Sequence, residues 1–100
     1  MFRPGAKPRQ FVSIDTRQIV RISKALGDEN RFRIFRTILE RGEISCKEIT
    51  ELFPLSQPTI SHHLKILTES GLIAIRKEGQ WSFFSINSRT VQQYLDSLSE

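Results

Sequence analysis

The sequence predicts a mainly α-helical domain with a small β-hairpin, its elements in the order α-α-α-α-β-β-α. Between Asp15 and Gly71, apolar residues recur at helical spacing and are interrupted by capping residues, glycine and proline. After Gly71 the pattern changes to two short runs rich in β-branched and aromatic residues, with a glycine turn between them. A final helical stripe follows. These observations together predict the order of elements.

The first two expected helices meet at Gly27 and Asp28. The first begins at Asp15, and its apolar stripe consists of Ile19, Ile22 and Leu26. Gly27 ends it, and Asp28 is a suitable N-cap for the second helix, which ends at Gly42. The expected core stripe of the second helix consists of Phe32, Phe35, Ile38 and Leu39. Its basic residues off that stripe are Arg31, Arg33 and Arg36.

The third and fourth expected helices form a helix-turn-helix. Ser45 and Glu48 have the spacing of a capping box, in which each side chain accepts a hydrogen bond from the other's backbone N–H. A short helix follows, with Ile49 and either Leu52 or Phe53 facing inward, and Pro54 breaks it. Ser56 then caps the fourth helix, and Pro58 lies in its first turn, where a missing N–H costs nothing. Two short helices around a tight turn are typical of this motif.

A β-hairpin and a last helix complete the pattern. The expected strands are residues 72–75 and 81–86, joined by a turn over residues 76–80 that contains Gly79. Asn87 and Ser88 open the last helix, whose apolar stripe consists of Val91, Tyr94, Leu95 and Leu98. A hairpin placed directly after a helix-turn-helix predicts a winged helix.

Length and charge place limits on function. The chain has 100 residues and a net charge of +4. This length predicts one domain over residues 13–100 after a flexible basic arm at residues 1–12. Residues 1–36 hold nine lysines and arginines against three acids, and the remainder holds six against eight. We therefore expect phosphate attraction and base recognition to come from different segments.

Several classes of protein are disfavoured by the sequence. No apolar run approaches the roughly 18 residues of a membrane span, and the N-terminus lacks the apolar core of a signal peptide, so a cytoplasmic protein is expected. An enzyme is not expected, because no nucleophile–base–acid set, glycine-rich phosphate loop or paired-carboxylate cleft is evident.

The fourth helix has the composition of a DNA-reading helix. Ile60, Leu64 and Leu67 fall within one narrow arc, which we expect to be buried, while the opposite arc is polar. Recognition helices place their N-terminal end in the major groove, where glutamine can pair with adenine. An inert solvated face is the alternative. The expected DNA-binding residues, including basic residues at the hairpin tip, are Ser56, Gln57, Thr59, Ser61, His62, Lys65, Arg76, Lys77 and Gln80.

His62, His63 and Cys46 do not predict a metal site. Adjacent helical residues point about 100° apart, so the two histidines cannot hold one ion as a pair four residues apart can. We expect His63, beside the core stripe, to be packed and hydrogen-bonded. Cys46 is the only cysteine, so no internal disulfide can form. It is either a partly buried structural residue or a thiol sensor.

Three blocks of sequence resemble the ArsR-type winged-helix repressors. They are residues 25–31 (ALGDENR), residues 55–65 (LSQPTISHHLK), and residues 71–73 with 78–81 (GLI and EGQW). The resemblance implies a homodimeric transcriptional repressor that binds double-stranded DNA at an inverted-repeat operator. It also implies a dimer interface formed by the first and last helices, with Ile19, Ile22, Leu26, Val91, Tyr94, Leu95 and Leu98 as the expected contacts.

The sequence departs from the sensing members of that family. Ser45 and Lys47 occupy the two cysteine positions of the metal-binding third helix. Residues 88–100 contain no histidine, and a single cysteine cannot form a dithiol sensor. We therefore expect no metal or other cofactor at the usual sites, and the effector is unknown. A winged-helix protein-interaction module and a thiol-responsive regulator acting through Cys46 remain as alternatives.

Overall fold

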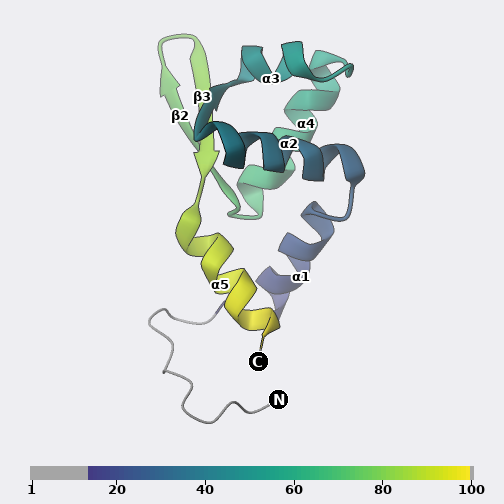
Figure 1. Cartoon of the computed structure of the whole chain (residues 1–100), viewed down its shortest axis with the longest axis vertical. Helices are drawn as coiled ribbons and strands as arrows, with labels where there is room; N and C mark the ends of the chain where they lie inside the picture. The colour runs from purple at the N-terminus through teal and green to yellow at the C-terminus, as the bar shows by residue number, and fades with distance from the viewer. Residues whose placement is uncertain (1–13, 100) are drawn as a thin grey trace.

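The structure is a computed structural model that describes residues 14–99, and it confirms the predicted winged helix. Within this range five helices and three strands follow one another: α1 (Thr16–Ala25), α2 (Glu29–Arg41), β1 (Glu43–Ser45), α3 (Cys46–Leu52), α4 (Gln57–Glu69), β2 (Ile73–Glu78), β3 (Trp81–Ile86) and α5 (Ser88–Leu98). The hairpin, α3 and the start of α4 lie at one end of the molecule, and α1 and α5 lie at the other (Figure 1). The expected arm at residues 1–12 lies outside the described residues.

The three strands form an antiparallel sheet in the order β1-β3-β2. The strand β1 is an addition to the predicted elements, and it pairs with β3 through Glu43 opposite Ser85. The hairpin strands pair up to Glu78 opposite Trp81, so Gly79 and Gln80 alone form the loop. Gly79 has φ +60°, the left-handed conformation that a two-residue hairpin loop requires.

The prediction that Arg76 and Lys77 lie at the tip of the β2–β3 hairpin, the wing, is therefore wrong. Arg76 lies opposite Phe83 and Lys77 opposite Ser82, inside β2 and short of the hairpin tip. The strand extends beyond its apolar run because the outer part of the hairpin is exposed, so polar side chains can alternate there while the backbone stays paired.

Side-chain caps begin four of the five described helices. The Asp15 side chain accepts from the N–H of Gln18 at 2.8 Å, and the Ser45–Glu48 capping box is present with both of its bonds. The Ser56 hydroxyl accepts from the N–H of Thr59 at 3.3 Å. Asn87 caps α5 in the same way. Asp28 is the N-cap residue of α2, as predicted, but its side chain makes no capping hydrogen bond.

The core packs one face of α2 against the other helices and the sheet, and that face differs from the prediction. Ile34, Phe35 and Ile38 are buried, whereas Phe32 is 40% exposed and Leu39 50% exposed. The buried stripe is thus rotated toward Ile34. In α3 Ile49 is fully buried as expected, and Phe53 packs against the core while Leu52 is exposed. Over residues 14–99, none of the helices combines the length and apolarity that a membrane crossing demands.

Candidate nucleic-acid interface

The helix α4 separates a buried face from a polar exposed one, as its sequence predicts. Ile60 and Leu67 are fully buried and Leu64 is 3% exposed. These residues fix the helix on the core, where α4 packs against α1, α2, α3 and β2. The exposed side chains of its first half are Gln57, Pro58, Ser61, His62 and Lys65. A rigid helix therefore presents a polar N-terminal half to the outside.

The candidate base-reading side chains differ in whether they already have a hydrogen-bond partner within the chain. The Ser56 hydroxyl, besides capping α4, lies 2.8 Å from the Thr59 hydroxyl. Ser56 therefore has a structural role at the helix start, and Thr59 is half-buried and already hydrogen-bonded. Among the described residues, Gln57, Ser61 and His62 have no side-chain hydrogen-bond partner. These three expose polar atoms that an incoming base edge could satisfy.

Arg76 is held within the wing by two carboxylates. Its Nε and Nη2 donate to the Glu43 carboxylate at 3.1 and 3.0 Å, and its Nη1 donates to Glu78 at 2.5 Å. Its guanidinium also lies 4.5 Å from the centre of the Phe83 ring. The hydrogen bond from Arg76 lowers the pKa of Glu43, and the two carboxylates raise the pKa of Arg76. Arg76 thus braces the hairpin against β1, and its charge is locally compensated.

A groove of about 510 Å³ connects the wing to the helix-turn-helix. It brings Gln57 of α4 and Gln80 of the hairpin loop, both predicted DNA contacts, into one lining. Lys47 and Trp81 also line it, and the Lys47 Nζ lies 5.8 Å from the centre of the Trp81 ring. The sequence reasoning did not include these two residues. An exposed aromatic directly after the wing loop was the available signal.

The remaining reactive side chains are in structural surroundings. His63 is 7% exposed and contacts Arg31, so it is packed and hydrogen-bonded as predicted. Cys46, the first residue of α3, is a half-buried free thiol. Within residues 14–99, no group of three or more histidine, cysteine, aspartate or glutamate side chains is arranged to hold a metal ion.

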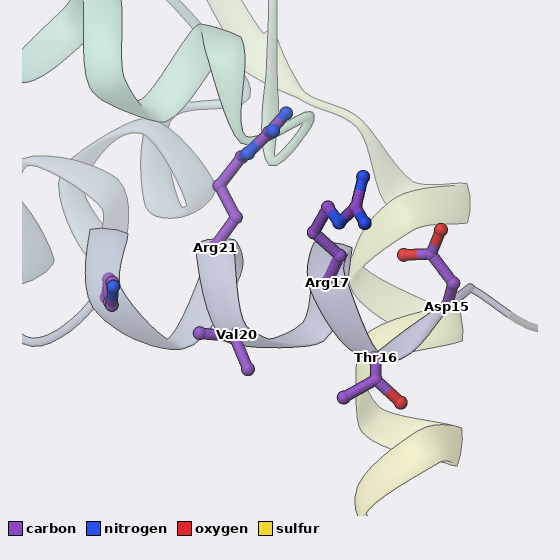
Figure 2. A pocket seen from close by; sticks show the side chains of 6 residues that line it. Asp15, Thr16, Arg17, Val20 and Arg21 are labelled. Atoms are coloured by element: carbon purple, nitrogen blue, oxygen red, sulfur yellow. The ribbon is translucent and has the colours of Figure 1, made fainter.

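The basic residues of α1 lie apart from this surface. Arg17, Arg21 and Lys24 line a surface depression of about 890 Å³ along α1, and Figure 2 shows Arg17 and Arg21 extending from the same side of the helix. In the described part of the chain, none of the three has an acidic partner within 4 Å. Because α1 is at the opposite end of the molecule from the α3–α4 turn (Figure 1), these cations do not share the surface of Gln57 and Gln80.

The expected dimer surface is only partly exposed. Ile22 is fully buried within one chain, so it belongs to the core, and the expectation that it lies on an interface is wrong. Tyr94 of α5 is half-buried, and its hydroxyl lies 2.8 Å from that of Ser23, which joins α5 to α1. Leu95 is 52% exposed and Leu98 is 59% exposed. The other expected contacts, all half-buried, are Ile19, Leu26 and Val91.

Known proteins share both this sequence and this fold. The model of the helix-turn-helix domain family matches residues 26–76. An uncharacterised HTH-type transcriptional regulator of Methanocaldococcus jannaschii is 42% identical over 80 residues, which span 79% of this chain and 89% of that protein. The arsenical resistance operon repressor of Bacillus subtilis is 36% identical over 72 residues, which span 72% of this chain and 69% of the repressor.

Solved structures agree with these relatives. HlyU from Vibrio cholerae superposes with a TM-score of 0.70 at 32% identity, over 83% of this chain and 89% of HlyU. The crystal structure of an ArsR family transcriptional regulator superposes with a TM-score of 0.77 at 23% identity, over 88% of this chain and 90% of that one, and shows the same fold.

The exposed polar helix start beside a β-hairpin, together with these similarities, defines a DNA-binding transcriptional regulator and not an enzyme. The chain belongs to the ArsR-type family of winged helix-turn-helix transcriptional regulators.

Proposed function

We propose that this regulator is a homodimeric repressor that binds an inverted-repeat operator, with Gln57, Ser61 and His62 of α4 reading base edges. Half-sites about one turn of DNA apart would match the two-fold symmetry of such a dimer. Lys65, Lys77 and Gln80 then contact the flanking backbone. Several of the similar proteins are named as repressors, among them the arsenical resistance operon repressor and the transcriptional repressor SdpR of Bacillus subtilis.

One observation carries the base-reading proposal. The first half of α4 exposes three polar side chains without partners among the described residues, while the opposite face of the same helix is fixed in the core. Because the helix backbone is already fixed on the core, only the side chains have to be ordered on binding, which favours specific pairing with base edges. Thr59 adds a methyl group that can contact a thymine methyl, and Ser56 holds the start of α4 in place through its capping hydrogen bond.

Selection of bound sequences from random duplex DNA tests this assignment. We expect an inverted repeat, and we expect Gln57→Ala to relax preference at one base pair of each half-site, at a cost of about 1–3 kcal/mol. Asn30→Ala is the matched control, because it removes an exposed amide from α2, outside the reading helix. Equal affinity for selected and random duplexes would remove the claim of sequence specificity. Unaltered preference in Gln57→Ala would remove Gln57 from the reading set.

The dimer proposal is supported by the exposed leucines of α5, Leu95 and Leu98. The helix α5 is joined to α1 by the contact between the Ser23 and Tyr94 hydroxyls. Two copies that cover these leucines would remove apolar surface from water. Leu95→Glu should then convert the protein to monomers in sedimentation analysis. Leu39→Glu is the control, since it places the same charge on an equally exposed apolar position of α2. A dimer that survives Leu95→Glu unchanged would contradict this interface.

We also propose that the protein does not sense metal through the family's third-helix site. Ser45 is buried and engaged in the α3 capping box, and Lys47 is exposed with a charge that repels cations. Operator affinity measured with a chelator and with zinc should agree. A tenfold or larger difference between the two conditions would refute this proposal.

A further inference from the structure

Arg31 connects three helices through its guanidinium. Its Nε donates to the carbonyl oxygen of Ala25 at 2.6 Å, and its Nη2 donates to that of Lys24 at 3.3 Å. Both acceptors belong to the last turn of α1, where the final carbonyls have no partner inside the helix, and the Lys24 carbonyl also accepts from the N–H of Gly27 at 3.1 Å. The third donor, Nη1, lies 3.2 Å from Nδ1 of His63 in the middle of α4. One side chain of α2 therefore links the end of α1 to the DNA-reading helix.

The contact with His63 defines the protonation state of its ring. A guanidinium carries only donors, so Nδ1 must be an acceptor, and the ring is neutral with its proton on Nε2. Because His63 is 7% exposed, solvent cannot easily replace Arg31 as its partner. Protonation would place a second N–H on Nδ1, directed at the donor and the positive charge of Arg31. The contact and the charged ring therefore exclude each other.

We propose that Arg31 and His63 form a clasp that sets the position of the reading helix against α1, and that protonation of His63 opens it and weakens operator binding. The inference rests on the proposed function for its effect on DNA. The clasp itself does not, because it is a contact between helices of one chain. Arg31 is a positioning residue here, since it acts on the operator only through α4.

The surroundings of the ring move this opening to a pH below the ordinary histidine pKa. Burial lowers the pKa of His63, and the neighbouring charges of Arg31 and His62 lower it further, while Asp28 at the start of α2 raises it. The helix α1 acts on the ring only through Arg31, which is held in place by the backbone carbonyls of Ala25 and Lys24. His63 is thus held neutral at pH 7, and its protonation forces two positive charges together.

The pH dependence of operator affinity tests the switch. If only the neutral ring permits tight binding, affinity for the selected duplex should fall by up to about a hundredfold for each pH unit below the His63 midpoint, because the proposed dimer carries two such rings. His63→Gln keeps an oxygen acceptor for Arg31 but does not titrate, so its affinity should lack this fall.

Nuclear magnetic resonance of the free protein tests the clasp without DNA. The amide signals of Ala25 and Leu26 should shift with the midpoint of the His63 ring, and His63→Gln should abolish that shift. If His63→Gln does not fold, Arg31→Gln serves instead, since removing the adjacent positive charge should raise the His63 midpoint.

The outcomes separate this inference from the proposed function. Equal pH dependence in the wild type and His63→Gln, or α1 amides that do not follow the His63 midpoint, would overturn the clasp. So would an unchanged His63 midpoint in Arg31→Gln. Absence of sequence preference at pH 8 would instead refute the proposed function, and the resonance measurement would still decide whether the clasp exists.

Discussion

The two adjacent basic residues of the wing should respond differently to removal. Lys77 is exposed and has no ion-pair partner in the described structure, so it is free to bind a phosphate. Arg76 is paired with Glu43 and Glu78. We therefore expect Lys77→Ala to reduce the salt dependence of DNA binding, and Arg76→Ala to leave that dependence largely intact while loosening the hairpin from β1.

The magnitude follows from counterion release. Each phosphate contact contributes about 0.9 to the slope of log affinity against log salt, so Lys77→Ala in a dimer should reduce the slope by about 1.8. Between about 50 and 200 mM salt, this reduction in slope means that the variant loses roughly 12-fold less affinity than the wild type. For Arg76→Ala we expect less than about half that change in slope, because the lost charge was already compensated.

Fluorescence anisotropy titrations of the selected duplex at four or more salt concentrations measure both slopes. Arg33→Ala is the control for net charge, since Arg33 is an exposed residue of α2 paired with Glu29 at 2.6 Å. It should leave the slope close to that of the wild type. The reasoning is refuted if Arg76→Ala reduces the slope as much as expected for Lys77→Ala, or if Lys77→Ala leaves it unchanged.

Three further predictions concern stability. Ser45→Ala should lower the free energy of unfolding by about 1–2 kcal/mol, because it removes the cap of α3; urea denaturation measures this. Ile60→Ala should cost about 2–5 kcal/mol, whereas Leu39→Ala should stay within about 0.5 kcal/mol; equal effects would contradict the burial of α2 and α4. Because folding lowers the pKa of His63, the unfolded chain binds more protons, so stability should decline as pH falls below about 6.5. The decline should level off below the folded pKa, and His63→Gln should reduce it.

Local chemistry made much of the fold predictable. The caps at Ser45 and Ser56 depend on residues three positions away, so the sequence alone contains both partners. The stripe of Ile60, Leu64 and Leu67 was also predictable, because the other faces of α4, apart from Pro58 and Ile66, carry polar residues and leave one choice for the buried side.

Choices that depend on distant partners were not predictable. The helix α2 has apolar residues on two overlapping stripes, and only packing against α4 and β3 decides that Ile34 is buried and Phe32 exposed. The strand β1 has three residues, too few for a periodic signal, and it exists because β3 pairs with it. The role of Arg76 depends on that same strand, since Glu43 is 33 positions away in sequence.

The position of charge explains how such a chain can bind DNA selectively. On the α3–α4–wing surface, Lys47, Lys65 and Lys77 are accompanied by exposed acids, Glu51 and Glu69 among them, while Arg76 is compensated. The unpaired cations of α1 are at the other end of the molecule. Since phosphate contacts supply most non-specific affinity, a nearly balanced reading surface should bind random DNA weakly. Under the proposed function, tight binding then requires base contacts from Gln57 and its neighbours in two protomers at once, which favours recognition of an inverted repeat over a single half-site.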